Sequence, residues 1–178
     1  MSGHNKWSKI KNKKAVTDAQ KSKIFGKLVR FIAVESKKAK GDVNSPGLRA
    51  AIEKAKEANV PSDNIERAVK KGTGGEAGSM EQITYEAYGP GGCALIIEAL
   101  TENRNKAAQE IKHILSRNGY ELATPGSALW AFEKESVAAE WAAKTEVPLS
   151  EEDSSKLQTL IEELEENDEV QEVFTNAE

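Results

Sequence analysis

The stretch QITYEAYGPGGCALIIEAL, residues 82–100, decides the class of fold. Apolar residues occupy alternate positions in its first part, and its last part is a continuous apolar run. Alternation with a period of two predicts a half-buried strand, and a short apolar run predicts a more deeply buried one. The segment Gly89-Pro90-Gly91-Gly92 supplies turn residues between them. We therefore predict strands over residues 82–88 and 93–100, joined by a tight turn.

The rest of the C-terminal part continues as a mixture of helices and strands. A helix is expected from the cap Asn103 to Asn118, and a second one begins after Ser150. Short strands are expected over 120–122 and 127–132, and a last strand over 170–175. This order indicates an α+β domain, an α/β sandwich in which helices pack on one face of a mainly antiparallel sheet.

The N-terminal part has a helical pattern instead. Apolar residues at intervals of four predict a helix over about 17–40. Ser45-Pro46 marks the start of a second helix that ends near Asn59, and a third runs from Pro61 to Lys71, with Gly72 just beyond its end. We predict a three-helix basic domain over residues 1–75. A glycine-rich linker over 72–79 then leads into an acidic α+β domain over 76–178.

The charge changes sign at the same linker. Residues 1–71 hold 18 basic and 7 acidic side chains, a net charge of +11, whereas residues 72–178 hold 7 and 22, a net charge of −15. Within residues 1–40 the balance is 12 basic against 2 acidic side chains, which is too uneven for an ordinary salt-bridged surface. The N-terminal part is therefore predicted to bind a polyanion, with nucleic acid as the partner.

We expect the contact surface to be spread over the basic arm and the three helices. Trp7 lies among the lysines of the arm, where it either stacks on a base or pins the arm to the bundle, and the sequence favours neither. The candidate nucleic-acid-binding residues are His4, Lys6, Trp7, Lys9, Lys11, Lys13, Lys14, Lys21, Lys23, Lys27, Arg30, Arg49, Arg67 and Lys71.

Catalysis finds no support in the sequence. Lys71-Gly72-Thr73-Gly74-Gly75 lacks the spacing of a phosphate-binding loop and lies between a helix and a strand. His4, Cys93 and His113 are too far apart in the chain to suggest a zinc site. The carboxylates of 151–153 and 162–168 are typical of a solvated helix surface. We expect no enzyme activity, no metal and no cofactor.

The composition also indicates the cellular compartment in which the protein is expected. The single cysteine, Cys93, cannot form an internal disulfide, which fits a reducing cytoplasm. The longest apolar run, 94–97, is far too short for a membrane helix, for which about 20 residues are needed. The lysine-rich residues 1–14 could be a transit peptide, but they contain no arginine. We expect a cytoplasmic protein, monomeric and without membrane contact.

Ten segments together resemble one known family. This is the YebC/PmpR family of probable transcriptional regulators, which is related to the mitochondrial translational activator of cytochrome oxidase. The resemblance extends over nearly the whole chain, and the YGPGG segment is its most distinctive part. The segments are GHNKW (3–7), KIFGKL (23–28), LRAAI (48–52), NVP (59–61), IERA (65–68), KGTG (71–74), YEAYGPGG (85–92), LTENRN (100–105), GSALWAF (126–132) and DEVQEV (168–173).

The resemblance implies a helical N-terminal domain followed by α/β domains. It also implies DNA-binding regulation and a ribosome-linked role in synthesis through difficult stretches such as proline runs. Because GHNKW opens bacterial members, it implies that the basic N-terminus belongs to the domain. The chain departs from the family near 134–147, where an additional inserted α/β domain is normally present, and at Tyr120, which is commonly glycine.

Three functions remain open at this point. They are an RNA-binding translation factor, a DNA-binding transcriptional regulator and a protein–protein adaptor acting through the acidic half. Lysine outnumbers arginine 15 to 3 in residues 1–71, which favours contact with the phosphate backbone over reading of guanine. Trp141, in the short segment that replaces the family's extra domain, either covers apolar surface of its own domain or marks a partner-binding patch. The flanks of that segment should lie close together, and 138–143 is expected to form a strand at the sheet edge.

Overall fold

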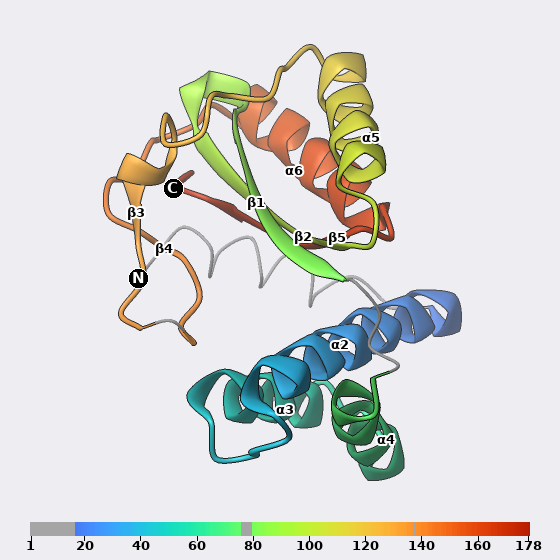
Figure 1. The fold of residues 1–178 in the computed structure, drawn as a ribbon. Helices are drawn as coiled ribbons and strands as arrows, with labels where there is room; N and C mark the ends of the chain where they lie inside the picture. Colours follow the sequence, from blue (N-terminus) through green and yellow to red (C-terminus); the bar gives the residue numbers. More distant parts are fainter. Residues whose placement is uncertain (1–16, 76–79, 137) are drawn as a thin grey trace. The chain divides into compact units, whose positions relative to one another are not determined.

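The computed structural model describes residues 17–75, 80–136 and 138–178. The described chain forms two compact units (Figure 1). One is built from helices α2, α3 and α4, and the other contains a β-sheet with two helices, within residues 81–134 and 140–178. Each unit has its own hydrophobic core. The predicted α+β class, a three-helix region followed by an antiparallel sheet with helices, is confirmed.

Helix α2 extends over Asp18–Ala39, close to the predicted span. It begins at Thr17, whose hydroxyl accepts a hydrogen bond from the Gln20 backbone N–H while the Gln20 side chain accepts one from the Thr17 N–H. This reciprocal capping satisfies two N–H groups that the first turn leaves unpaired. Lys40 ends the helix in the left-handed conformation, with a φ of 52°.

Helix α3 spans Pro46–Glu57 and helix α4 spans Ser62–Thr73. Pro46 stands at the first position of α3 as predicted, but the Ser45 hydroxyl does not cap a backbone N–H of that helix. Both helices pack on α2, and Ile32, Leu48 and Ile65 lie in the shared core.

Gly72 was predicted to stand just beyond the third helix, and this is wrong. It is buried in the last turn of α4, where an added Cβ would lie 2.5 Å from both the Ala33 carbonyl oxygen and the Ser36 Cβ. The neighbouring Ser36 is also buried, and its hydroxyl donates a 2.7 Å hydrogen bond to the Val69 carbonyl oxygen. Glycine is therefore needed here for the close approach of α2 and α4, not for ending the helix.

The sheet consists of strands β1 (Glu81–Tyr88), β2 (Ala94–Thr101) and β5 (Val170–Thr175), in the order β1-β2-β5. Both neighbouring pairs are antiparallel. A short 3-10 helix, η1 (Pro90–Gly92), joins β1 to β2. β2 is the central strand and is buried along its whole length, as its apolar sequence predicts.

Two helices cover one face of this sheet, as predicted (Figure 1). They are α5 (Arg104–Arg117), which is capped by Asn103, and α6 (Glu151–Glu166), which is capped by Ser150. The core between helices and sheet contains side chains from β1, β2, β5, α5 and α6, among them Leu95, Ile97, Ile111, Leu115, Leu157, Leu160, Leu164, Val170 and Val173.

The segment that follows α5 contains less strand than predicted. Leu122 forms only an isolated bridge with Ala87, and residues 129–131 form the 3-10 helix η2 (Leu129–Ala131). The reason is the buried carboxylate of Glu86, which accepts hydrogen bonds from the backbone N–H groups of Gly126, Ala128 and Leu129 at 2.6–2.9 Å. These N–H groups therefore donate to a side chain and do not form the backbone hydrogen bonds of a strand.

Two very short strands lie at the other face of the main sheet. They are β3 (Phe132–Glu133) and β4 (Ala142–Ala143), which pair with each other so that Phe132 lies opposite Ala143. This pairing joins residues 132–133 to residues 142–143, whereas Val147, at the far flank of the predicted segment, forms a bridge with Ala177. The predicted edge strand over 138–143 is wrong, because only its last two residues pair and their partner is β3 rather than the main sheet.

Candidate nucleic-acid interface

The candidate residues fall into two groups. His4, Lys6, Trp7, Lys9, Lys11, Lys13 and Lys14 lie outside the described residues. The other seven occupy all three helices of the N-terminal unit, with Lys21, Lys23, Lys27 and Arg30 on α2, Arg49 on α3, and Arg67 and Lys71 on α4.

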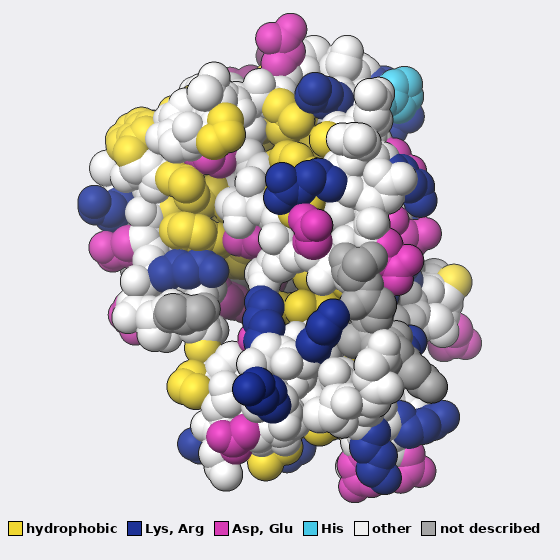
Figure 2. Space-filling view, in the orientation of Figure 1, with side chains coloured by type: hydrophobic (Ala, Val, Ile, Leu, Met, Phe, Trp, Pro, Cys, Tyr) yellow, Lys and Arg dark blue, Asp and Glu magenta, His cyan; other side chains and the backbone are white. Residues whose placement is uncertain are grey.

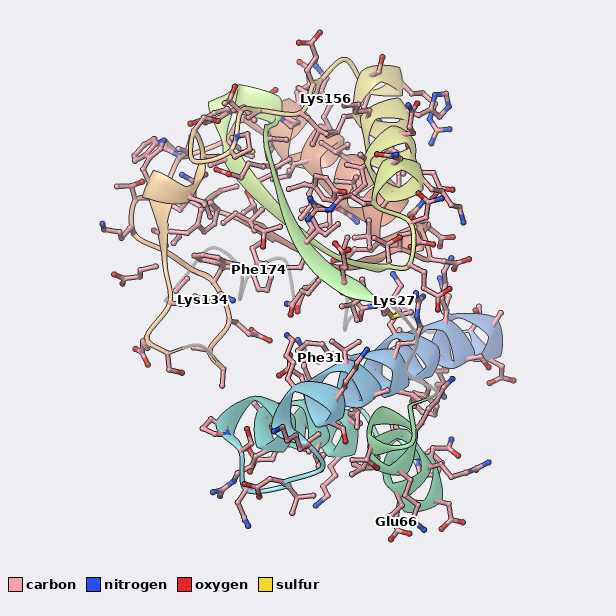
Figure 3. The ribbon with its side chains drawn as sticks, viewed as in Figure 1. Lys27, Phe31, Glu66, Lys134, Lys156 and Phe174 are labelled. Carbon is pink, nitrogen blue, oxygen red and sulfur yellow. The ribbon has the colours of Figure 1, made fainter. Side chains whose placement is uncertain are left out.

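Helix α2 brings three of these cations onto one side. Lys23, Lys27 and Arg30 are spaced at i, i+4 and i+7, so they follow one face of the helix, and we call them the α2 basic stripe. The apolar residues of α2 that pack on α3 and α4 lie on another face. In Figure 3, Lys27 projects from the side of α2 away from α3 and α4.

The stripe is positively charged along its length. No acidic residue occurs between Asp18 and Glu35, which is a span of more than four helical turns. The three stripe side chains are half-buried, as is usual when a long basic side chain packs its alkyl stem against the protein. Arg30 is held in part by the sulfur of Met80, 3.9 Å from its Nη2. Lys21 is exposed but lies on a different side of the helix, so the structure does not gather it into the stripe.

The arginines of α3 and α4 are engaged within their own helices. Arg49 Nε lies 3.3 Å from Glu53 Oε1 in an exposed ion pair. Arg67 donates to the Asp63 carbonyl oxygen at 3.3 Å and to Asn64 Oδ1 at 2.7 Å. Both side chains remain exposed, but each shares its charge or its donors with a near neighbour.

The exposed surface of α4 carries charges of both signs. Asp63, Glu66, Arg67 and Lys70 line a shallow depression there, so its middle has no net excess of positive charge. Towards the end of the helix only Lys70 and Lys71 remain, where cations also interact favourably with the helix dipole. Lys70 was missing from the predicted set, although its position beside Lys71 and three residues after Arg67 was a visible signal.

Metal ligation and cysteine chemistry can be examined in the described residues. Within them, no group of three or more histidine, cysteine or acidic side chains could hold a metal ion. Burial raises the pKa of the Cys93 thiol, which disfavours the thiolate that a nucleophile requires. In the same part of the chain, no helix is both long enough and apolar enough to cross a membrane.

Two models of a known protein family match the chain over most of its length. The N-terminal domain of the TACO1/YebC protein matches residues 5–75, and the second and third domain of TACO1/YebC match residues 80–139 and 133–177. The chain belongs to the TACO1/YebC family. This confirms the resemblance drawn from the ten sequence segments.

Several TACO1/YebC relatives are named "Probable transcriptional regulatory protein". The relative from Fervidobacterium nodosum is 56% identical over 136 residues, which cover 75% of this chain and 54% of the relative. The relative from Rubrobacter xylanophilus is 50% identical over 140 residues, covering 77% and 56%. The chain thus spans about half the length of the curated relatives it matches.

A solved structure that resembles this chain is that of the conserved hypothetical protein Aq1575 from Aquifex aeolicus. It is 30% identical to this chain, with a TM-score of 0.78, and the match covers 90% of this chain and 91% of that one. The fold described above is therefore one that has been observed experimentally.

Proposed function

We propose that this chain is a non-enzymatic, nucleic-acid-binding regulator of gene expression. The observation that carries the proposal is the α2 basic stripe, a cationic helix face in a half of the chain with a net charge of +11. Closely spaced cations on a helix bind the phosphate backbone and release its condensed counterions. We propose that residues 1–75 bind the phosphate backbone and that the acidic domain, residues 76–178, positions them.

The first candidate process is transcription, with DNA as the partner. It is supported by the names of the relatives, which describe probable transcriptional regulatory proteins. The protein would act in the cytoplasm as a monomer, without a cofactor.

The second candidate process is translation, with ribosomal or transfer RNA as the partner and synthesis through proline-rich stretches as the step assisted. It is supported by the lysine excess of 15 to 3 over arginine in residues 1–71, because lysine binds phosphates as a point charge without selecting a base. Sedimentation of the tagged protein with ribosomes, with and without nuclease, separates the two processes.

Binding itself is tested with variants of the full chain. Lys23→Gln combined with Lys27→Gln removes two charges from the stripe while keeping helix propensity and the alkyl stems. At about 0.1 M salt, the loss of two phosphate contacts should weaken binding to a duplex DNA or structured RNA probe by about 10- to 100-fold. Lys54→Gln combined with Lys56→Gln on α3 is the matched control and should have a much smaller effect. Equal effects of the two pairs would show that only net charge matters and would remove α2 from the interface.

A protein–protein adaptor acting through the acidic half is the alternative. It predicts that neither pair of substitutions changes function and that nucleic-acid probes do not bind in the first place. If a chain whose α2 basic stripe is neutralised still regulates gene expression, the adaptor function is favoured.

A further inference from the structure

Helix α5 is a basic island in the acidic half of the chain. Four of the seven lysine and arginine residues in 72–178 lie on it, whereas it contains one acidic residue, Glu110. Figure 2 shows dark-blue and cyan side chains together over this helix, on the part of the unit where α5 lies in Figure 1. The net charge of −15 for the whole half conceals this local excess. The four basic residues are Arg104, Lys106, Lys112 and Arg117.

The two faces of α5 differ sharply in chemistry. The inner face is apolar and buried against the sheet and α6. The opposite face carries Asn105, Gln109, Lys112, His113 and Ser116, and we call these five residues the α5 outer face. All five are exposed and lie at i, i+4, i+7, i+8 and i+11, so they form one continuous stripe. Among the described residues, none of these five side chains is engaged in a hydrogen bond or an ion pair.

The carboxylates beside this face are already engaged. Arg104 pairs with Glu81 at 3.2 Å and Arg117 pairs with Glu163 at 2.7 Å. Lys106 lies 3.5 Å from Glu169. Lys106 also lies 3.8 Å from Glu110, so three cations and four carboxylates are paired at the rim of the α5 outer face. The stripe itself carries Lys112 and His113 without an acid among them, so an approaching polyanion meets a rim of ion pairs around the Lys112 ammonium.

We propose that the α5 outer face reads base edges in the major groove of duplex DNA. Asparagine and glutamine can form paired hydrogen bonds to adenine, and lysine can donate to the acceptors of guanine. An α-helix fits the major groove of B-form DNA, whereas the major groove of duplex RNA is too deep and narrow for side chains to enter. The α2 basic stripe supplies phosphate contacts only, so α5 provides the sequence readout that regulation of particular genes requires. This inference rests on the proposed function and names its target.

A protein partner fits the α5 outer face less well. Binding energy at protein interfaces is concentrated in buried aromatic, arginine or large apolar anchors. The exposed large hydrophobic residues of the described chain are Ile24, Val43, Tyr88 and Trp130, and α5 contains none of them. A face of two amides, a lysine, an imidazole and a hydroxyl is suited to polar edges in a charged groove.

The test uses the full chain and a matched pair of double variants. Gln109→Ala with Lys112→Ala alters the α5 outer face, and Gln158→Ala with Lys156→Ala removes the same two residue types from α6. All four sites are on solvent-facing parts of helices, where alanine is favourable, so both variants should fold, as circular dichroism will show. The probe is a library of random duplex DNA of about 30 base pairs, with duplex RNA and single strands of the same length for comparison.

The wild type and the α6 variant should enrich the same sequences from the library. The α5 variant should bind the enriched DNA about 5- to 100-fold more weakly, the range for one or two lost base contacts, and should enrich no sequence. If the wild type binds and the α5 variant matches the α6 variant, this inference is overturned and the proposed function stands. A defect confined to RNA probes would overturn the assignment to DNA. If the wild type binds no probe, the proposed function fails and this inference fails with it.

Discussion

Trp141 donates a hydrogen bond from its indole Nε1 to Oε1 of Glu98, across 2.7 Å. Glu98 lies on the central strand and is 8% exposed, and its carboxylate also accepts from the Thr84 hydroxyl at 3.1 Å. The Trp141 ring packs on the core cluster that contains Ile96 and Phe174, on the sheet face opposite α5 and α6. Trp141 therefore satisfies a buried carboxylate and covers apolar surface at once. This supports the intramolecular role over a partner-binding patch.

Replacing Trp141 by serine should lower the free energy of unfolding by about 2–3 kcal/mol, because the half-buried ring is lost and Glu98 loses a donor. Trp130→Ser is the matched control, since that ring is 59% exposed and donates only to the Tyr88 hydroxyl. Its effect should stay below about 1 kcal/mol. Chemical denaturation measures both. If the Trp141 variant keeps its full stability but no longer associates with a partner, Trp141 belongs to a partner-binding patch instead.

The contrast between β1 and the segment after α5 shows what sequence can predict here. Alternation in 82–88 and the apolar run of 93–100 determine their strands locally, and the caps Thr17, Asn103 and Ser150 determine helix starts. Residues 126–129 have their conformation determined by Glu86, about 40 residues earlier in the chain. No local pattern contains that information.

The same limit applies to the interface. The sequence predicts a cationic face on α2, because Lys23, Lys27 and Arg30 follow one another at helical spacing. The engagement of Arg67 by the Asp63 carbonyl and Asn64 depends on side-chain geometry and was not predicted. The basic residues of α5 were not among the predicted sites, because charge was summed over a whole domain, whereas four of its seven basic residues lie on this one helix.

Gly72→Ala should destabilise the helical unit. The added methyl group would meet the Ala33 carbonyl oxygen and Ser36 at 2.5 Å, so α2 and α4 must separate or shift. Overpacking of this kind costs about 1–3 kcal/mol. Gly26→Ala is the control within α2, because nothing lies within 4 Å of the added group. That variant should gain about 0.5–1 kcal/mol from helix propensity, and a melting curve of each variant compares them. A neutral Gly72 variant would contradict the close packing of α2 on α4.

Acid should weaken the contact between α5 and α6. Hydrogen bonds from Arg117 at 2.7 Å and Asn118 at 2.9 Å hold the pKa of the Glu163 carboxyl below its usual value of 4.5. A lowered pKa in the folded state means that the stabilisation is present above pH 4.5 and is lost as the pH falls through the folded-state pKa. The effect is small, since the Glu163 side chain is one-third exposed.

The measurement for Glu163 is the free energy of unfolding from about pH 6 to about pH 3. The wild type should lose more stability over this range than Glu163→Gln, which has no carboxylate to protonate. Glu121→Gln removes an exposed carboxylate elsewhere and should retain the wild-type pH dependence. If Glu163→Gln and the wild type lose stability in parallel, the Arg117 and Asn118 contacts contribute nothing to the acid response.

Nucleic-acid binding should weaken steeply with salt. Each phosphate neutralised by a lysine or arginine releases condensed counterions, and the 12 basic residues in positions 1–40 allow on the order of 4–8 such contacts. A plot of log K against log salt should then have a slope of about −4 to −7 for duplex DNA. Lys23→Gln with Lys27→Gln should make this slope shallower by about 2, because two cations leave the α2 basic stripe.

Gln109→Ala alone, on the α5 outer face, should lower affinity for an enriched sequence without changing the slope, since an uncharged amide displaces no counterion. A slope near zero for the wild type would show that phosphates are not the principal contact, and it would remove the physical basis of the basic surface on α2.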